Sequence, residues 1–218
     1  MSKSVWAATE QGFRRVIAPL SDYLVARRVN PNVLTTVGTL CACTAGIIFA
    51  TGHISIAGWT LGLTATMDFF DGEVARRTGQ STVFGAFYDS TLDRIADGFV
   101  LGGLTFFYAS NTVHHSLVMV VILLAGLLGT FVTSYTRSRA ETLGVPMKGV
   151  GMMERAERIV LLSAPQAFFG LALNGWVLRV IITFLCVAAV ITAGQRILHV
   201  ARVTGGTPLP PPSGEPAS

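Results

Sequence analysis

The chain alternates long apolar runs with short polar segments. Six of the runs approach the roughly 20 residues that a helix needs to cross a bilayer. They cover residues 33–50, 54–70, 84–108, 116–135, 159–173 and 177–200. Only 13% of the 218 residues are charged, whereas a soluble domain carries about 25%. The pattern therefore predicts an all-α integral membrane protein with six transmembrane helices.

The distribution of Lys and Arg predicts the orientation of these helices. Basic residues gather before the first run, after the second, between the fourth and fifth, and after the sixth. The segments on the opposite side contain almost none, with Arg179 as the exception. Because cytoplasmic loops carry the excess of Lys and Arg, we expect both termini on the cytoplasmic side of the plasma membrane.

The two ends of the chain differ from the six-helix domain predicted for residues 31–204. In residues 1–30, apolar side chains recur at near-helical spacing beside Arg14 and Arg15. These side chains are Trp6, Phe13, Val16, Ile17 and Leu20. The spacing predicts an amphipathic helix at the membrane interface, with an ordinary packed helix as the alternative. Residues 205–218 are rich in Pro, Gly and Ser, which predicts a disordered tail.

Net charge narrows the choice of partners. A formal charge of +4 fits attraction to anionic membrane lipids and to phosphorylated substrates. Nucleic acid is not an expected partner, because no basic segment with interleaved aromatic residues accompanies the charge.

One polar stretch interrupts the apolar pattern, "MDFFDGEVARRTGQSTVFGAFYDSTLDRIAD" at residues 67–97. Asp68 and Asp71 share one helical face at the end of the second run, and Asp89 and Asp93 share one face in the third. A polar turn at residues 76–82 would make the two helices antiparallel and bring the four carboxylates together. Asp97 follows one turn later and has no assigned role.

Four carboxylates that close together repel one another unless cations lie between them. Carboxylate oxygens suit Mg²⁺, with Mn²⁺ as an alternative. Two such ions about 3.5–4 Å apart form a site for displacement at phosphorus. Arg76 is placed to bind a phosphate as a bidentate fork, and Thr82 to donate a hydrogen bond to one. The alternative for Arg76 and Arg77 is that they only set the membrane orientation.

The spacing Asp68-x-x-Asp71-Gly72-x-x-Ala75-Arg76, followed after eight residues by Gly85-x-x-x-Asp89-x-x-x-Asp93, resembles the signature of the CDP-alcohol phosphatidyltransferases. The resemblance implies six transmembrane helices, a homodimer, and a cytoplasmic site with two divalent cations. It implies a reaction in which CDP-diacylglycerol gives its phosphatidyl group to an alcohol and CMP is released. Gly98 and Gly102 are spaced as in a helix-packing seam, either between copies or within one chain.

The same resemblance implies a role for individual residues. The metal ligands would be Asp68, Asp71, Asp89 and Asp93, which we name the signature aspartates. Asp93 would also be the general base that deprotonates the attacking hydroxyl. The donor would contact Pro31, Asn32, Val33, Leu34, Gly72, Arg76 and Thr82.

Three further segments bear on the acceptor. "DSTLDR" from residue 89, "SYTRSRAE" from residue 134 and "ERAERIV" from residue 154 are similar to segments of actinobacterial phosphatidylinositol phosphate synthases. The implied acceptor is inositol 1-phosphate, also numbered 3-phosphate. Its phosphate would contact Ser134, Arg137, Arg139, Arg155, Arg158 and Arg196. The chain departs from those segments at Arg137, where Lys is usual, and at Ala156, where Pro is common.

Two other functions stay open at this point. Glycerol 3-phosphate also bears a phosphate, so a phosphatidylglycerophosphate synthase is the enzymatic alternative. The arginines would then bind that phosphate, or would only follow the rule for cytoplasmic loops. Carboxylates within membranes also line ion pathways, which makes a cation-coupled transporter the non-enzymatic alternative.

Overall fold

The computed structural model describes residues 18–147, 149–153 and 155–205, and over these residues the chain is helical, with no strand. The helices are α2 (Pro31–Ala50), α3 (Ile54–Thr78), α4 (Val83–Ser110), α5 (Leu117–Thr142), α6 (Arg155–Phe169) and α7 (Trp176–Thr204), with a short 3-10 helix η1 (Ala172–Gly175) before α7. The predicted all-helical fold class is thus confirmed for the described residues.

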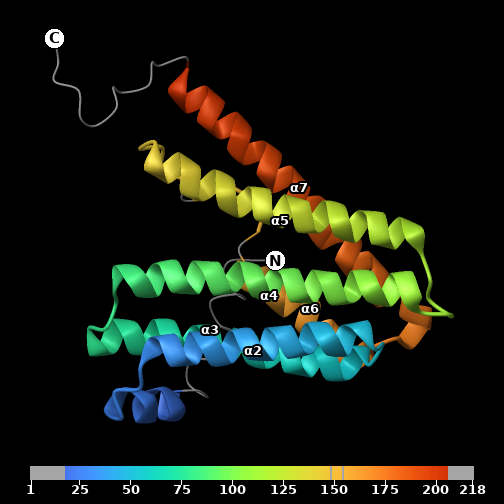
Figure 1. The fold of residues 1–218 in the computed structure, drawn as a ribbon, viewed down its shortest axis with the longest axis horizontal. Coiled ribbons are helices and arrows are strands. Elements are labelled where there is room, and N and C mark those ends of the chain that lie inside the picture. Colours follow the sequence, from blue (N-terminus) through green and yellow to red (C-terminus); the bar gives the residue numbers. More distant parts are fainter. Residues whose placement is uncertain (1–17, 148, 154, 206–218) are drawn as a thin grey trace, which may run out of the picture.

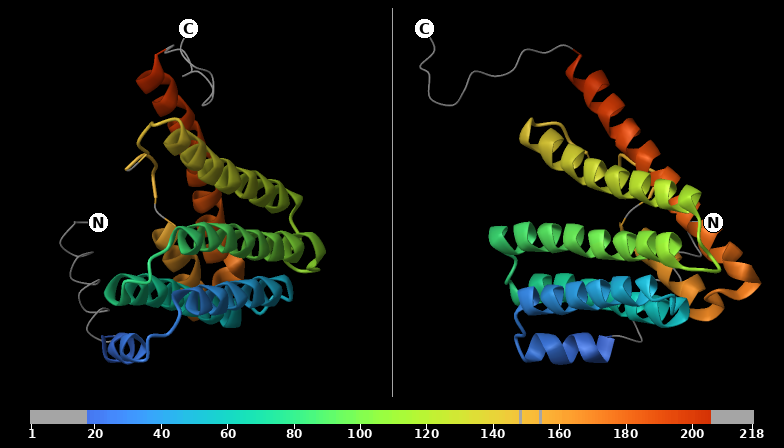
Figure 2. Two further views of the ribbon diagram at one scale, coloured as in Figure 1. Left: turned by 60° about the vertical axis from the view of Figure 1, so that its left-hand side comes forward. Right: turned by 45° about the vertical axis from the view of Figure 1, so that its right-hand side comes forward.

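The helices form one bundle (Figure 1). α2 packs against both α3 and α4, while α5 packs against α4 and α7. α6 lies between the two groups and packs against α3 and α7. α7 crosses the bundle obliquely, as the two views of Figure 2 show. The start of α2, the turn between α3 and α4, and the ends of α5 and α7 all lie at one end of the bundle, which we name the α3–α4 end.

The turn between α3 and α4 is shorter than the sequence predicts. α3 stays helical through Arg76 to Thr78 and stops at Gly79, whose φ of 69° lies in the left-handed region that favours glycine. Thr82 then caps α4 by accepting a hydrogen bond from the Gly85 amide at 2.9 Å. The polar turn therefore covers only residues 79–82, because Arg76 and Arg77 belong to the last turn of α3.

Three helical segments are long and apolar enough to cross a membrane: Pro31–Ala50, Leu117–Thr142 and Ala172–Thr204. α3 and α4 have 25 and 28 residues, but their polar ends interrupt the apolar pattern. α6 has 15 residues, which at about 1.5 Å each reach roughly 22 Å, less than the hydrocarbon core of about 30 Å. The structure thus supports three membrane-spanning helices, and the number six remains a prediction.

The fifth predicted span is four residues too long, since α6 ends at Phe169. Gly170 follows with a φ of 49°, and Leu173 and Asn174 adopt φ values of 55° and 56°. These left-handed residues reverse the chain into α7. Hydrophobicity alone could not reveal this end, because "GLAL" continues the apolar run.

Only the last part of the predicted amphipathic segment belongs to the described residues. Residues 18–26 form a helix. Leu24 and Val25 pack against the buried side chains of Phe70 and Val74 on α3. A second link is the ion pair between Asp22 and Arg77, at 2.8 Å. Trp6, Phe13, Val16, Ile17 and the predicted tail beyond Gly205 lie outside the described residues.

The backbones of α2 and α4 lie close together at two glycines. A Cβ atom on Gly103 would collide with the Gly46 carbonyl group, and one on Gly46 would collide with the Phe99 carbonyl group. The pair that the sequence suggested as a packing seam is not the one used here. Gly102 has open space where its Cβ would point, and Gly98 would meet one ring atom at 3.7 Å. The contact within the chain therefore depends on Gly103.

We predict that Gly103→Ala destabilises the protein by roughly 1–3 kcal/mol, since the added methyl group forces two helix backbones apart. The matched control is Gly102→Ala, on the same helix with no atom within 4 Å of the new Cβ, and it should leave stability nearly unchanged. Thermal unfolding of both variants in one detergent compares them directly. Equal melting temperatures for the two variants would contradict the assigned packing.

Candidate active site

Aspartates from two helices meet near the α3–α4 end of the bundle. Asp68 and Asp71 lie in the second half of α3, and Asp89 and Asp93 lie in the first half of α4. Asp89 and Asp68 are close enough to repel both Asp71 and Asp93 electrostatically. The structure therefore brings together the four carboxylates that the sequence placed on facing helices.

A hydroxyl group from α2 orients one of these carboxylates. The buried Thr35 side chain donates a hydrogen bond from Oγ1 to Asp71 Oδ2 at 2.7 Å. Such a contact fixes the direction in which the free carboxylate oxygen points. Sequence reasoning missed Thr35, although it directly follows Leu34 in the segment that the family resemblance assigned to the donor site.

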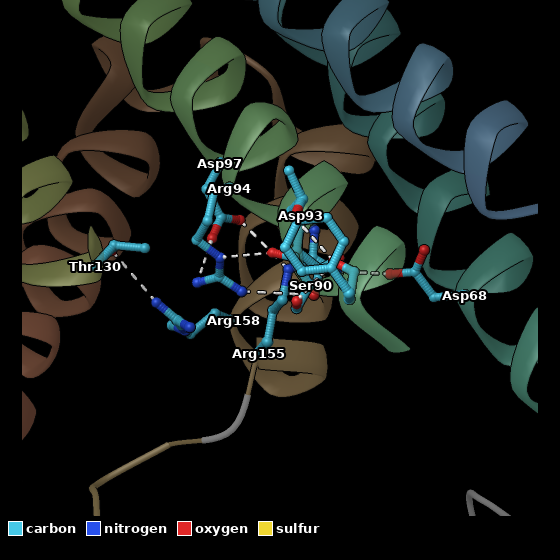
Figure 3. A network of polar contacts seen from close by, with 10 residues as sticks. Asp68, Ser90, Asp93, Arg94, Asp97, Thr130, Arg155 and Arg158 are labelled. Carbon is cyan, nitrogen blue, oxygen red and sulfur yellow. Dashed lines mark hydrogen bonds and ion pairs between the residues drawn. The ribbon is translucent and has the colours of Figure 1, made fainter. Parts of the chain in front are cut away.

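The guanidinium group of Arg155 bridges three carboxylates (Figure 3). Its Nη1 lies 2.8 Å from Asp68 Oδ2 and 2.9 Å from Asp93 Oδ1, and its Nε lies 3.5 Å from Asp97 Oδ1. The side chain is only 18% exposed. A buried cation is stable only when anions surround it, and these carboxylates from α3 and α4 provide that surrounding. The sequence had assigned Arg155 to the acceptor phosphate, and the structure places it against the aspartates.

The aspartates have the chemistry of a metal site, although the described residues contain no preformed group of three metal-binding side chains. Arg155 accounts for this, because it lies between Asp68 and Asp93 and pairs with both. Carboxylate oxygens are the ligands that hard divalent cations prefer. The guanidinium itself shows that a positive charge is favourable among them. The donor set therefore fits divalent cations that take the place of Arg155.

Positive charge continues from the aspartates toward α5 and α7. Arg158 experiences repulsion from Arg94 and Arg155, and Arg196 from Arg137 and Arg158. We name these five residues the arginine cluster. Guanidinium groups bind phosphate through paired charge-assisted hydrogen bonds, so this cluster beside the carboxylates suits a ligand with a phosphate dianion.

The predicted acceptor residues on α5 and α6 differ in their other contacts and in their exposure. Arg137 also pairs with Glu141 on the next turn of α5, at 3.0 Å, and both side chains are half exposed or more. Arg139 is exposed near the end of α5, and Ser134 is partly buried on the same helix. Arg158 donates from Nη1 to the buried Thr130 hydroxyl at 3.4 Å, a partner that the sequence did not suggest.

Arg196 has a structural task that the sequence also did not suggest. Its Nη1 donates to the Thr133 carbonyl group at 2.6 Å, and its Nε donates to the Val150 carbonyl group at 3.0 Å. One turn earlier on α7, Thr192 Oγ1 accepts a hydrogen bond from the Met152 amide at 3.2 Å. We name Thr192 and Arg196 the α7 latch, because together they hold residues 150–152, just ahead of Arg155.

The predicted donor residues lie at the same end of the bundle, in two groups. The Arg76 guanidinium lies over Gly72, so that a Cβ atom there would come within 3.1 Å of Nη1. In the second group, Thr82 Oγ1 and Asn32 Oδ1 would lie 3.1 and 3.3 Å from a Cβ atom on Gly85. The absence of a side chain at each glycine thus leaves room for these predicted donor residues to lie close to the helix backbone.

The N-terminal turn of α2 holds the remaining donor residues. Pro31 and Leu34 are buried there, and Val33 is exposed. Asn30 caps the helix by accepting from the Asn32 amide at 3.0 Å. The start of α2 thus lies beside the turn between α3 and α4, with Asn32 Oδ1 near Gly85.

Helices α2 to α7, with aspartates and arginines gathered at one end, define a class of enzyme. The chain belongs to the CDP-alcohol phosphatidyltransferase family, whose family model matches residues 28–202. The enzyme class implied by the signature is confirmed, and this membership favours the enzyme over the transporter. Enzymes of this family use divalent metals, which agrees with the donor set.

Similar proteins narrow the class. The chain is 34% identical to the phosphatidylinositol phosphate synthase of Streptomyces avermitilis, over 87% of this chain and 80% of that protein. It is 34% identical to the archaetidylinositol phosphate synthase of Methanothermobacter thermautotrophicus, over 86% and 89%.

Solved structures of a similar protein share the fold. The phosphatidylinositol phosphate synthase (PgsA1) of Mycobacterium tuberculosis with CDP-DAG bound superimposes with a TM-score of 0.75 at 31% identity, covering 86% of this chain and 94% of that one. Its complex with manganese and citrate gives a TM-score of 0.73 at 31% identity, covering 84% and 87%.

We predict that Thr192→Val loosens the loop ahead of Arg155. The variant keeps the side-chain shape but loses the acceptor for the Met152 amide, a hydrogen bond worth about 1 kcal/mol. Amide hydrogen exchange of residues 149–153 should become roughly fivefold faster. Thr183→Val, on the same helix, removes a hydroxyl whose contact is the Met119 sulfur at 4.0 Å, and should leave that exchange unchanged. Unaltered exchange in Thr192→Val would argue against the α7 latch.

Proposed function

We propose that this protein transfers the phosphatidyl group of CDP-diacylglycerol to inositol 1-phosphate (also numbered 3-phosphate), giving phosphatidylinositol phosphate and CMP. The observation that carries the proposal is the adjacency of the signature aspartates and the arginine cluster. The first group suits the diphosphate of the donor, and the second suits an acceptor that already bears a phosphate. The names of the similar synthases and the CDP-DAG complex of the mycobacterial protein support it.

The signature aspartates are proposed to hold two divalent cations, Mg²⁺ with Mn²⁺ as a substitute. Bound there, the cations would neutralise the donor diphosphate and favour departure of CMP. Two observations support this role: the all-oxygen donor set, and the manganese complex of the similar mycobacterial enzyme. Thr35 keeps Asp71 oriented for this purpose.

The remaining steps fall to the side chains. Asp93 accepts the proton of the acceptor hydroxyl, whose oxygen forms a new bond to the lipid-side phosphorus. The bond between that phosphorus and the bridging oxygen breaks, and CMP leaves with the oxygen. Gly72, Arg76, Thr82 and the segment of residues 31–34 bind the donor.

The arginine cluster is proposed to orient the acceptor through its phosphate, so that the hydroxyl meets Asp93. Ser134 and Arg139 complete the proposed acceptor site from α5. Arg196 contributes both charge and the hold on residues 150–152. Orientation of this kind turns a collision of two substrates into a reaction within one complex.

The proposed setting is the plasma membrane. Six helices would cross it, with the α3–α4 end and both termini on the cytoplasmic side. Large side chains on α2 and α5, such as Leu40, Val121 and Leu128, are more than half exposed, which suits contact with acyl chains or with the second subunit of a homodimer. The donor's acyl chains would enter sideways from the bilayer.

A test of the reaction supplies purified protein with CDP-diacylglycerol and Mg²⁺, and offers inositol phosphate, glycerol 3-phosphate, free inositol or serine in parallel. We expect CMP release with inositol phosphate only. Asp93→Asn should lower the rate by roughly 10²–10⁴-fold, the usual contribution of a general base. Release with glycerol 3-phosphate alone would replace the proposed acceptor. A parallel assay replaces CDP-diacylglycerol with CDP-archaeol, and CMP release with CDP-archaeol alone would indicate an ether-lipid enzyme of the archaeal kind.

A second test concerns the metal ligands. Thr35→Val removes the hydrogen bond to Asp71 and should weaken Mn²⁺ binding by roughly 10–100-fold, as loss of a contact to a ligand does. Asp71→Asn should weaken it further. The matched control is Thr39→Val, one turn along α2, where the hydroxyl donates to the Thr35 carbonyl group of its own helix. Mn²⁺ titration followed by electron paramagnetic resonance measures all three, and equal affinities in the two Thr variants would contradict the assignment.

A further inference from the structure

Asp97 is the one aspartate of the stretch at residues 67–97 that has no part in the reaction proposed above. It lies one helical turn beyond Asp93 on α4, and its side chain is only 15% exposed. Its Oδ2 atom is buried and accepts no hydrogen bond among the described residues. Removing a carboxylate from water without full hydrogen bonding is costly, so its burial needs a compensating charge.

Two arginines provide that charge, one near each oxygen of the Asp97 carboxylate. Arg94 Nη1 lies 3.5 Å from Asp97 Oδ2, and Arg155 Nε lies 3.5 Å from Asp97 Oδ1. Figure 3 shows Asp97 beside Arg94 on the same helix, and Arg155 reaches Asp97 from α6. Asp97 therefore links the helix of the proposed base to the first residue of α6.

Arg155 contacts Asp97 through a different nitrogen from the one that contacts the signature aspartates. Nη1 meets Asp68 and Asp93, whereas Nε faces Asp97. In the proposed function, divalent cations bind Asp68 and Asp93 in place of Arg155. Asp97 is then the carboxylate that still holds Arg155, because it lies on the Nε side.

A small cavity of about 60 Å³ lies on this side of Arg155. Its polar wall consists of Asp97, Arg155, Arg158, Thr64 and Thr130, and the rest of the wall is apolar. The Nε atoms of both arginines and the Thr64 hydroxyl are buried without a hydrogen-bond partner in the described structure. The guanidinium thus has room to shift without leaving Asp97.

We propose that Asp97 is a positioning residue that keeps Arg155 beside the site when divalent cations displace it from Asp68 and Asp93, so that its Nη atoms face the acceptor phosphate. This inference rests on the proposed function for the identity of the acceptor. The Arg155–Asp97 contact also lowers the competition between Arg155 and the cations, since a guanidinium held by Asp97 needs the signature aspartates less.

The test compares Asp97→Asn with the unmodified protein. The Michaelis constant for inositol phosphate should rise roughly 10–100-fold, as for loss of a hydrogen bond to a charged group. The Michaelis constant for CDP-diacylglycerol should stay within about twofold. Asp97→Glu, which keeps the charge, should recover most of the acceptor affinity. Asp22→Asn is the matched control. It also removes one carboxylate, which pairs with Arg77 and lies far from Asp97 in the sequence.

A binding measurement tests the coupling without turnover. In Asp97→Asn, Arg155 has only the signature aspartates to pair with, so Mn²⁺ affinity should fall about fivefold. In the Arg155→Gln background the same substitution should change Mn²⁺ affinity by less than about twofold, because the competing cation is gone. If Asp97→Asn fails to fold, Asp97→Glu and Arg155→Gln still test the idea. Arg155→Gln should then bind Mn²⁺ more tightly than the unmodified protein.

Equal effects of Asp97→Asn in both backgrounds would overturn the proposal, as would a lower melting temperature with an unchanged Michaelis constant for the acceptor. Mn²⁺ binding by Arg155→Gln no tighter than that of the unmodified protein would also overturn it. The Mn²⁺ measurement does not depend on the acceptor. A different acceptor in the assay of CMP release would therefore reject the proposed function while leaving the coupling of Asp97 and Arg155 to be judged separately.

Discussion

The whole site depends on one electrostatic constraint: carboxylates packed between helices must be neutralised. α3 and α4 bring the signature aspartates and Asp97 close together, and their mutual repulsion would separate the helices unless cations lay among them. Arg155 supplies positive charge through its contacts with Asp68, Asp93 and Asp97. The first residue of α6 therefore lies against the carboxylates, and the α7 latch holds residues 150–152.

The same constraint connects structure to chemistry. Carboxylates that attract a guanidinium also suit divalent cations. In the proposed function, the donor substrate brings a diphosphate whose charge such cations would neutralise. Two glycines contribute in a different way, since Gly72 lets the Arg76 guanidinium and Gly85 lets the Thr82 hydroxyl lie close to the helix backbone. One end of the bundle therefore brings carboxylates and arginines together, an arrangement that suits the two phosphorylated substrates of the proposed function.

Much of this arrangement could be predicted because it is local. The spacing of the aspartates places them on one face of each helix, and a short turn makes the two helices neighbours. The partners of Arg155 and Arg196 could not be predicted, since they depend on how helices far apart in the sequence pack and on where residues 150–152 lie against α7. Thr35, Thr130 and Thr192 were missed for a related reason: a threonine in an apolar helix looks like a packing residue until its neighbour on another helix is known. The end of α6 was misplaced because left-handed backbone at Gly170 and Leu173 leaves no trace in hydrophobicity.

The Arg155 bridge also bears on how such an enzyme is made. A chain in which Arg155 already pairs with Asp68, Asp93 and Asp97 does not need free magnesium to neutralise those three carboxylates while its helices insert and pack. Metal loading then becomes an exchange of one cation for others in a finished scaffold, rather than a step of folding. Newly made protein would be insensitive to metal supply during assembly and sensitive to it only when catalysis begins.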